Sequence, residues 1–406
     1  MSIRLATVAA LVLTLSAAGT GQSILPRVAP DAAGLTPAVL DDAMALLEQF
    51  VADRKIAGAV AGVARRGQIG YLQAVGVQDL TTRTPMSERT LFRIYSMTKA
   101  VTAVAVMMLH EAGAFRLDDP VQKYLPEFAA VQVVESPGAV PRPPVRPITV
   151  EDLLLHTSGL SHRTSELYRA LGVRSREDTL ATFVTRITKA PLMEDPHTRF
   201  RYSEGTTVLG RLVEIWSGQP FDAFLAQRIF QPLDMTDTVF VVGPSRRDRL
   251  ATVYGPAPGG GLVPVAMEAV PFTTRPRLLE GAVGLVSSVP DFLRFSQMLL
   301  GKGALGSTRL LPAATVARMT ANALPPDVLK ARGGRMGWGL GNVDVRMNAG
   351  DSGANVGEFG WDGTGGTIFW VDPVTETIVV LMTQSTPANP DGIRQKFKTI
   401  VQRAVR

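Results

Sequence analysis

Residues 91–113 read LFRIYSMTKAVTAVAVMMLHEAG, and this stretch decides the fold. A strand-like segment, 91–95, passes into residues 97–109, which are apolar nearly all round and therefore predict a buried helix. Gly113 is placed to end that helix. Ser96 then lies at the helix N-terminus, with Lys99 one turn later on the same face, a spacing that lets the two side chains meet.

The pairing of Ser96 with Lys99 suggests nucleophilic catalysis. A serine hydroxyl is a poor nucleophile until a neighbouring base takes its proton. Lysine can be that base only where burial or nearby positive charge lowers its pKa, and the apolar helix supplies the burial. The alternative is a helix-capping serine and a surface lysine. Because an unpaired lysine among apolar positions is costly, the pattern favours function.

The regions outward from this stretch predict strands at both ends of the chain and helices in the middle. Two hairpins are expected, one from 57–64 and 69–75 and one from 366–371 and 377–383. Thr36-Pro37 is placed to open a covering helix that runs to Val51, and a second covering helix is expected over 393–405. The middle predicts helices over 149–155, 204–216 and 221–230, and Ser288 is placed to cap another that ends at Leu300. The expected fold class is α/β of the α+β type, an antiparallel sheet flanked by helices with a helical lobe inserted. A catalytic cleft is expected between the lobes.

The N-terminus resembles a secretory signal. Residues 1–21 combine an early Arg4, an apolar run over 5–15 and small residues up to Gly21. We expect export to a periplasm or the medium without a membrane anchor, because the apolar run is too short to span a bilayer. The remainder, 22–406, is predicted to be one folding unit, with a mixed α/β lobe at about 30–105 and 285–406 and a helical lobe at about 106–284.

Composition excludes several classes of function. The chain has no cysteine, which rules out thiol catalysis and thiolate zinc sites. The net charge of +6 is scattered rather than gathered on a basic helix, so no nucleic-acid partner is expected. No phosphate loop or dinucleotide fingerprint occurs, and His110 lacks a second histidine at metal-binding spacing. Neither a cofactor nor a metal is therefore expected.

Three elements in order resemble the serine β-lactamase and penicillin-binding-protein family, in particular class C β-lactamases, D-aminopeptidases and related esterases. They are Ser96-Met97-Thr98-Lys99, then Tyr202-Ser203-Glu204, then Gly360-Trp361-Asp362-Gly363 before a predicted strand. Segments 154–160 and 368–373 are also similar, so the resemblance runs from about Gly34 to the end.

The resemblance implies a role for each matching residue. Ser96 would be the nucleophile, Lys99 its base, and Tyr202 a phenolate-like or proton-relaying partner that protonates the leaving group and later activates water. The oxyanion hole would consist of the backbone N–H groups of Ser96 and Thr364. Residues 22–406 would then form one β-lactamase-like serine hydrolase domain.

Two positions depart from the β-lactamase pattern and bear on the substrate. Glu204 stands where β-lactamases have Asn, and Trp361 stands where they have the Lys that binds a substrate carboxylate. Asp362, if it faced the cleft, would repel an anion, whereas Gly363 would let a substrate approach the strand edge. Related esterases have Trp at this position, so an uncharged ester is expected. Glu204 could also pair with Lys99 and keep it protonated.

The predicted function is therefore a carboxylesterase that acts on short to medium acyl esters. Alternatives are a class C-like β-lactamase or D-amino-acid peptidase, an acyltransferase, and a penicillin-binding receptor without turnover. The partner would be a small-molecule ester or amide. Gly350-Asp351-Ser352-Gly353 resembles a chymotrypsin-like nucleophile segment, but the helical middle and the lack of cysteine argue against that fold. His156 is expected to be structural rather than at the cleft edge, and Trp338 is either a substrate wall or core.

Overall fold

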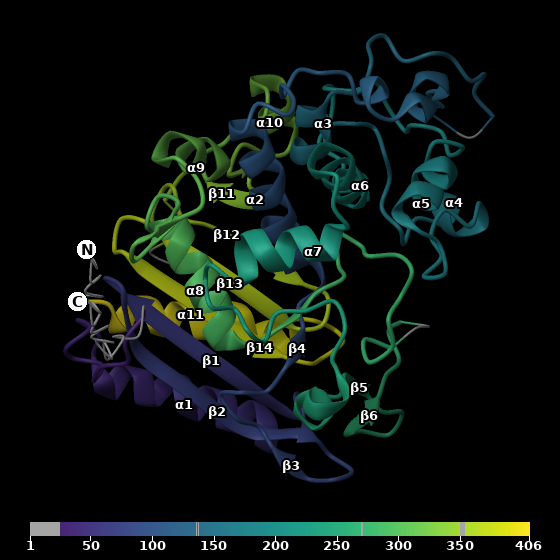
Figure 1. Ribbon diagram of the computed structural model, residues 1–406. Coiled ribbons are helices and arrows are strands. Elements are labelled where there is room, and N and C mark those ends of the chain that lie inside the picture. The colour runs from purple at the N-terminus through teal and green to yellow at the C-terminus, as the bar shows by residue number, and fades with distance from the viewer. Residues whose placement is uncertain (1–24, 135, 137, 269–270, 350–353) are drawn as a thin grey trace, which may run out of the picture.

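The computed structural model describes residues 25–406, apart from 135, 137, 269–270 and 350–353. Its largest sheet has eight strands in the order β10-β11-β12-β13-β14-β1-β2-β3, and neighbouring strands are antiparallel (Figure 1). Ala61 of β1 lies opposite Leu381 of β14, so the two ends of the chain meet in the middle of one sheet. The strand bounds are β1 (Gly58–Arg65), β2 (Gln68–Asp79), β3 (Thr84–Pro85), β10 (Met336–Gly339), β11 (Val343–Arg346), β12 (Phe359–Gly363), β13 (Thr367–Asp372) and β14 (Thr377–Thr383).

One face of this sheet is covered by α1 (Pro37–Ala52) and α11 (Ile393–Ala404), which pack against each other. Helix α1 buries Leu40, Ala43, Leu47 and Phe50, the spacing of a single helical stripe. Pro37 stands in its first turn, where its missing N–H costs nothing. The predicted terminal helices are confirmed.

The other face of the sheet is covered by α8 (Val289–Leu300). A Cβ at Gly62 of β1 would lie 2.8 Å from side-chain atoms of both Val289 and Leu293, so glycine is what lets α8 pack this closely. The predicted cap is confirmed, because the Ser288 hydroxyl accepts a hydrogen bond from the Asp291 N–H at 3.4 Å.

Helix α2 (Thr98–Glu111) carries the stretch from which the sequence argument started, and its residues from Thr98 to Leu109 are all buried. It packs against α6 (Gly205–Ser217) and α7 (Phe221–Leu225). The helix expected over 221–230 differs in one respect: it is an α-helix to Leu225 and a π-helix over Ala226–Phe230. The remaining α-helices are α3 (Val150–Leu155), α4 (Glu166–Ala170), α5 (Leu180–Ile187), α9 (Ala313–Met319) and α10 (Pro326–Ala331).

Among the described residues, three short strand pairs lie outside the large sheet. They are β4 (Phe92–Arg93) with β7 (Val286–Ser287), β5 (Tyr254–Pro256) with β6 (Leu262–Pro264), and β8 (Ala304–Leu305) with β9 (Thr308–Arg309). The pair β4 and β7 holds the segment that leads into Ser96.

The predicted fold class is confirmed, since a large antiparallel sheet is flanked by helices and most of the remaining helices lie to one side of it (Figure 1). The division into two lobes stays a prediction, and the region expected to be helical also contains the hairpin of β5 and β6. The predicted signal, 1–21, and the segment 350–353 lie outside the described residues. No helix in the described part of the chain is both long and apolar enough to cross a bilayer.

Candidate active site

Ser96 lies in a 3₁₀ turn, Tyr95–Met97, directly before α2. The preceding residue, Tyr95, has φ +42°, a left-handed conformation that costs free energy in a bulky residue. Its buried ring packs edge-on against Phe272 with ring centroids 5.9 Å apart. This packing holds the strained turn, which presents a Ser96 side chain that retains slight exposure to solvent.

Lys99 is completely buried one turn further along α2. Its Nζ donates to the carbonyl oxygen of Ala282 at 3.1 Å and lies 4.5 Å from the centroid of the Tyr202 ring. Burial is the largest influence and lowers the pKa of Lys99 to about 7, while Glu204 raises it and Arg163 lowers it further. A substantial fraction of Lys99 is therefore neutral near pH 7 and able to accept a proton.

Tyr202 connects Lys99 with the strand of the third sequence element. Its hydroxyl accepts a hydrogen bond from the Nε1–H of Trp361 at 3.1 Å. Burial raises the pKa of Tyr202 above its ordinary value, although its hydrogen bonds with Ser96 and Trp361 act in the opposite direction. The side chain is thus a neutral phenol that can relay a proton, rather than a phenolate.

Aromatic rings pack against Tyr202 and Trp361. The His156 ring lies 4.8 Å from that of Tyr202, and the Trp338 ring 4.6 Å from that of Trp361. Both supporting residues are fully buried: His156 Nδ1 accepts from the Ser203 N–H at 3.3 Å, and Trp338 Nε1 donates to the Leu154 carbonyl at 3.0 Å. The structural reading of His156 is confirmed, and Trp338 is core.

Glu204 is the N-cap residue of α6 and is fully buried. Its Oε2 accepts from the Thr207 hydroxyl at 3.1 Å, and it makes no ion pair with Lys99. Burial acts to raise the pKa of Glu204, but the charges of Arg163 and Lys99 outweigh it and lower that pKa. Glu204 is therefore an ionised carboxylate that acts on the site through its charge.

The side chains of the third sequence element, 360–363, point to both faces of β12. Trp361 contacts Tyr202, whereas the Asp362 carboxylate accepts from Arg394 of α11 at 2.8 Å. The alternation of side chains along a strand explains this separation. Asp362 was expected to repel an anion if it faced the cleft; the structure pairs it with Arg394 instead, so it does not join Trp361 in the site.

Gly363 packs closely on the segment that leads to Ser96. A Cβ at this position would lie 2.3 Å from the carbonyl oxygen of Ile94, two residues before Ser96. The glycine therefore makes room for the protein's own backbone, and its expected role in substrate approach stays a prediction. The same contact brings the segment of Ser96 beside Thr364, which is exposed just past β12.

Arg163 is the residue of this site that the sequence analysis missed. Its positive charge influences the pKa of Lys99, Tyr202 and Glu204. Its Nη1 is buried and has no hydrogen-bond partner within the described residues. No sequence signal distinguishes it among the 42 Lys and Arg residues, except that it closely follows the segment 154–160.

Two cavities must be distinguished near the sheet. One of about 570 Å³ lies between the end of α1 and the hairpin of β5 and β6. Neither Ser96, Lys99, Tyr202 nor Trp361 lines this cavity. A second, of about 410 Å³, is lined by Thr364 and Arg163. The second cavity is the one that adjoins the site.

Known proteins are similar to this chain over most of its length. The family model described as Beta-lactamase matches residues 44–401. Esterase EstB of Burkholderia gladioli is 32% identical over 378 residues, which cover 86% of this chain and 91% of EstB. Lovastatin esterase of Penicillium rubens is 30% identical over 288 residues, covering 67% of this chain and 70% of that protein.

Solved structures agree with these sequence relatives. The structure of EstCE1, described as a hydrolase with promiscuous acyltransferase activity, has a TM-score of 0.78 and 26% identity, and the match covers 91% of this chain and 98% of that one. The resemblance that rests on the three sequence elements is confirmed, and the chain belongs to the beta-lactamase family.

Proposed function

We propose that this protein hydrolyses carboxylic esters with short to medium acyl groups through an acyl-enzyme on Ser96. The observation that carries the proposal is the buried contact of Lys99 with Tyr202 beside Ser96, in which burial lowers the pKa of Lys99 to about 7. The protein is a carboxylesterase-like serine hydrolase, in keeping with the esterases among its relatives.

In the first half of the reaction, the Ser96 oxygen forms a bond to the ester carbonyl carbon while its proton passes to Lys99. The phenol of Tyr202 gives its proton to the departing alkoxide, so the carbon–oxygen bond to the alcohol breaks, and Lys99 returns a proton to Tyr202. The backbone N–H groups of Ser96 and Thr364 would bind the oxyanion.

In the second half, water attacks the acyl carbon. The water proton passes to the Tyr202 and Lys99 pair and then to the Ser96 oxygen as the acyl bond breaks. The products are a carboxylic acid and the free enzyme. Since Trp361 replaces the Lys that holds a β-lactam carboxylate in similar enzymes, esters are favoured over β-lactams.

The test compares the purified protein, Ser96→Ala and Ser307→Ala on p-nitrophenyl butyrate, with nitrocefin in parallel. Ser307 is an exposed serine in the turn between β8 and β9 and provides the matched control. We expect many turnovers of the butyrate, a loss of about 10³-fold or more in Ser96→Ala, no change in Ser307→Ala and no nitrocefin turnover. Equal activity in Ser96→Ala would remove the proposed nucleophile, and nitrocefin turnover without ester turnover would indicate a β-lactamase.

Acyl transfer is a second candidate, which the description of EstCE1 favours. An alcohol can replace water as the acceptor of the same acyl group. Adding an alcohol to the butyrate assay and separating the butyrate ester from butyric acid measures the split between the two. Ester product that rises with alcohol concentration at constant p-nitrophenol release would support transfer, and butyric acid alone would exclude it.

We also propose that the protein is exported. The support is the charged, apolar and small-residue order of residues 1–21. Mass spectrometry of the protein recovered from the cell envelope or medium should find an N-terminus close to residue 22. A full-length protein confined to the cytosol would contradict export.

A further inference from the structure

We propose that the ester substrate carries a carboxylate, which Arg163 and Arg169 bind in the cavity beside Thr364. This inference rests on the proposed esterase function and names the substrate class. It differs from the uncharged ester expected from sequence, which rested on Trp361 in place of the carboxylate-binding Lys and on a possible repulsion of anions by Asp362.

The cavity has the position and size for part of a substrate. Its volume is about 410 Å³, and Thr364 lines it at the end of β12. Arg163, Arg169 and Arg174 line it as well, together with Glu268 and Tyr168. A substrate whose carbonyl oxygen lies at the Thr364 amide can therefore extend into this space.

The charges around the cavity do not balance. Arg174 donates to Glu268 at 2.8 Å and to Glu280 at 2.5 Å, and Arg176 donates to Glu280 at 3.1 Å. These two arginines and two glutamates neutralise one another. Arg163 and Arg169 make no ion pair and no side-chain hydrogen bond within the described part of the chain.

Arg163 is the cavity arginine whose charge acts on the catalytic residues. Its charge influences Lys99, Tyr202 and Glu204, so it lies within electrostatic range of all three. Glu204 offsets part of this charge but directs its hydrogen bond to Thr207. A buried guanidinium nitrogen without an acceptor is costly. A carboxylate that enters the cavity would supply two acceptors in the geometry that arginine prefers.

The third sequence element does not oppose an anion here. Trp361 is uncharged, and the Asp362 charge is paired with Arg394 on the α11 side of β12. The cation that other family members place on this strand is absent, and the loop after segment 154–160 supplies Arg163 and helix α4 supplies Arg169 instead. In this proposal the anion site therefore moves from the strand to this loop and helix.

The test uses the full protein and two pairs of esters. Mono-p-nitrophenyl adipate and p-nitrophenyl hexanoate differ only by a carboxylate on the acyl side. The butyrate ester of 4-hydroxybenzoate and phenyl butyrate differ only by a carboxylate on the alcohol side. The measured quantity is the ratio of kcat/KM for the anionic ester to that for its neutral partner, after subtraction of the uncatalysed rates.

We expect a ratio of about ten or more in one of the two pairs, decreasing as salt screens the charges. Arg163→Gln and Arg169→Gln should each reduce that ratio at least severalfold, mainly through the KM of the anionic ester. Arg163→Lys should retain part of it, since the charge remains but the forked geometry is lost. Any shift in the pKa of Lys99 caused by Arg163→Gln affects both esters and cancels in the ratio.

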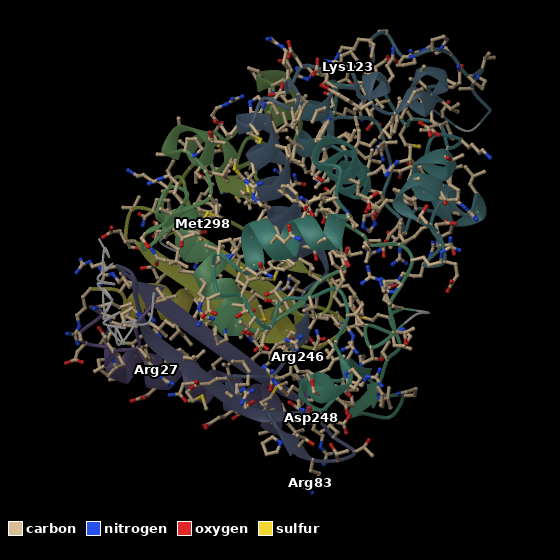
Figure 2. The ribbon with its side chains drawn as sticks, in the orientation of Figure 1. Arg27, Arg83, Lys123, Arg246, Asp248 and Met298 are labelled. Atoms are coloured by element: carbon tan, nitrogen blue, oxygen red, sulfur yellow. The ribbon has the colours of Figure 1, made fainter. Side chains whose placement is uncertain are left out.

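The control variant is Arg83→Gln. Arg83 is exposed near β3, at the end of the molecule opposite α10, and Figure 2 shows it at the outer edge. It should leave the ratio unchanged. Turnover with a ratio of one or less in both pairs, or a ratio that neither Arg163→Gln nor Arg169→Gln lowers, would overturn the inference alone. Failure to turn over any of the four esters, or equal activity in Ser96→Ala, would instead overturn the proposed function.

Discussion

At the scale of single residues, opposing charges set the reactivity of Lys99. Burial dominates and lowers the pKa of Lys99 to about 7, Glu204 raises it, and Arg163 lowers it. Glu204 does not pair directly with Lys99, so it does not hold the lysine fully protonated. The Glu204 carboxylate therefore raises the pKa of Lys99 through its charge without forming an ion pair with it.

The pH dependence of Glu204→Gln tests this balance. The base acts in its neutral form, so activity should rise with pH through the pKa of Lys99. Removing the Glu204 anion removes an influence that raises this pKa, and the rising limb of kcat/KM should therefore move to lower pH. Stopped-flow or plate assays over pH 5–9 measure this rising limb of kcat/KM. Glu48→Gln, at an exposed position of α1, should leave it in place, and a shift of Glu204→Gln to higher pH would contradict the account.

The hydrogen bond from Trp361 to Tyr202 allows a second test by double-mutant cycle. Trp361→Phe keeps an aromatic ring but removes the N–H donor, and we expect kcat/KM to fall by about three- to tenfold, the effect of one hydrogen bond. Tyr202→Phe should cost about 10²- to 10⁴-fold. In the Tyr202→Phe background, Trp361→Phe should have almost no further effect. An equal effect of Trp361→Phe in both backgrounds would show that Trp361 acts independently of the Tyr202 hydroxyl.

At the scale of elements, the packing of the Ser96 turn on β12 aligns the two halves of the site. Gly363 permits the contact with Ile94, and a Cβ at Gly365 would lie 2.6 Å from the ring of Tyr95. Gly363 at the end of β12 and Gly365 in the turn after it thus leave room for a turn that is already strained at Tyr95.

Gly363→Ala should displace the turn. We expect a loss of about 1–3 kcal/mol in the free energy of unfolding, from overpacking, together with a larger loss of esterase activity than the unfolded fraction accounts for. Urea unfolding and kcat measured on the same preparation test both effects. Gly243→Ala is the matched control, because a Cβ there would contact nothing within 4 Å and its φ of −64° suits alanine. Wild-type activity and stability in Gly363→Ala would show that the contact is not required.

At the scale of the whole molecule, the N- and C-terminal regions form one layered unit. Strand β1 pairs with β14, and α1 packs on α11 over the same face. Arg394 of α11 donates to the carbonyl oxygens of Gly363 and Thr367 and to Asp362, so the last helix also holds the strand that supports the site. Stability of the outer layer and geometry of the site are therefore linked.

Phe397→Ala tests the contribution of this layer. Phe397 is fully buried between α11 and the sheet, and its truncation should reduce the free energy of unfolding by about 3–5 kcal/mol. Arg403→Ala, on the exposed side of the same helix, should change it by less than about 0.5 kcal/mol. Chemical unfolding followed by circular dichroism compares the two. Similar stability of both variants would mean that α11 is not part of the core that stabilises the sheet.

The sequence allowed the fold to be predicted where periodicity was strong. The terminal helices, both hairpins and the buried helix after Ser96 follow from their apolar patterns and from Pro37 and Ser288 at helix starts. The π-helical end of α7 was not predictable, because a single inserted residue leaves the apolar pattern almost unchanged.

The site residues that belong to ordered sequence motifs could be predicted. Contacts between side chains from separate elements could not. Ser96, Lys99, Tyr202 and Trp361 are found together at the positions that the resemblance implies. The face that Asp362 takes depends on the partner offered by α11, and the role of Gly363 depends on how close Ile94 approaches. Arg163 could not be singled out, since its importance comes from unbalanced charges on elements distant in sequence.

The central claim, an acyl-enzyme on Ser96, is tested most directly by intact-protein mass spectrometry after rapid mixing with p-nitrophenyl butyrate and acid quenching. The account predicts a transient mass increase of one butyryl group, which proteolysis assigns to the peptide that contains Ser96 and which disappears as the ester is consumed. Ser96→Ala should show no such adduct. Ester turnover without an adduct on that peptide at any quench time, or an adduct that persists in Ser96→Ala, would contradict it.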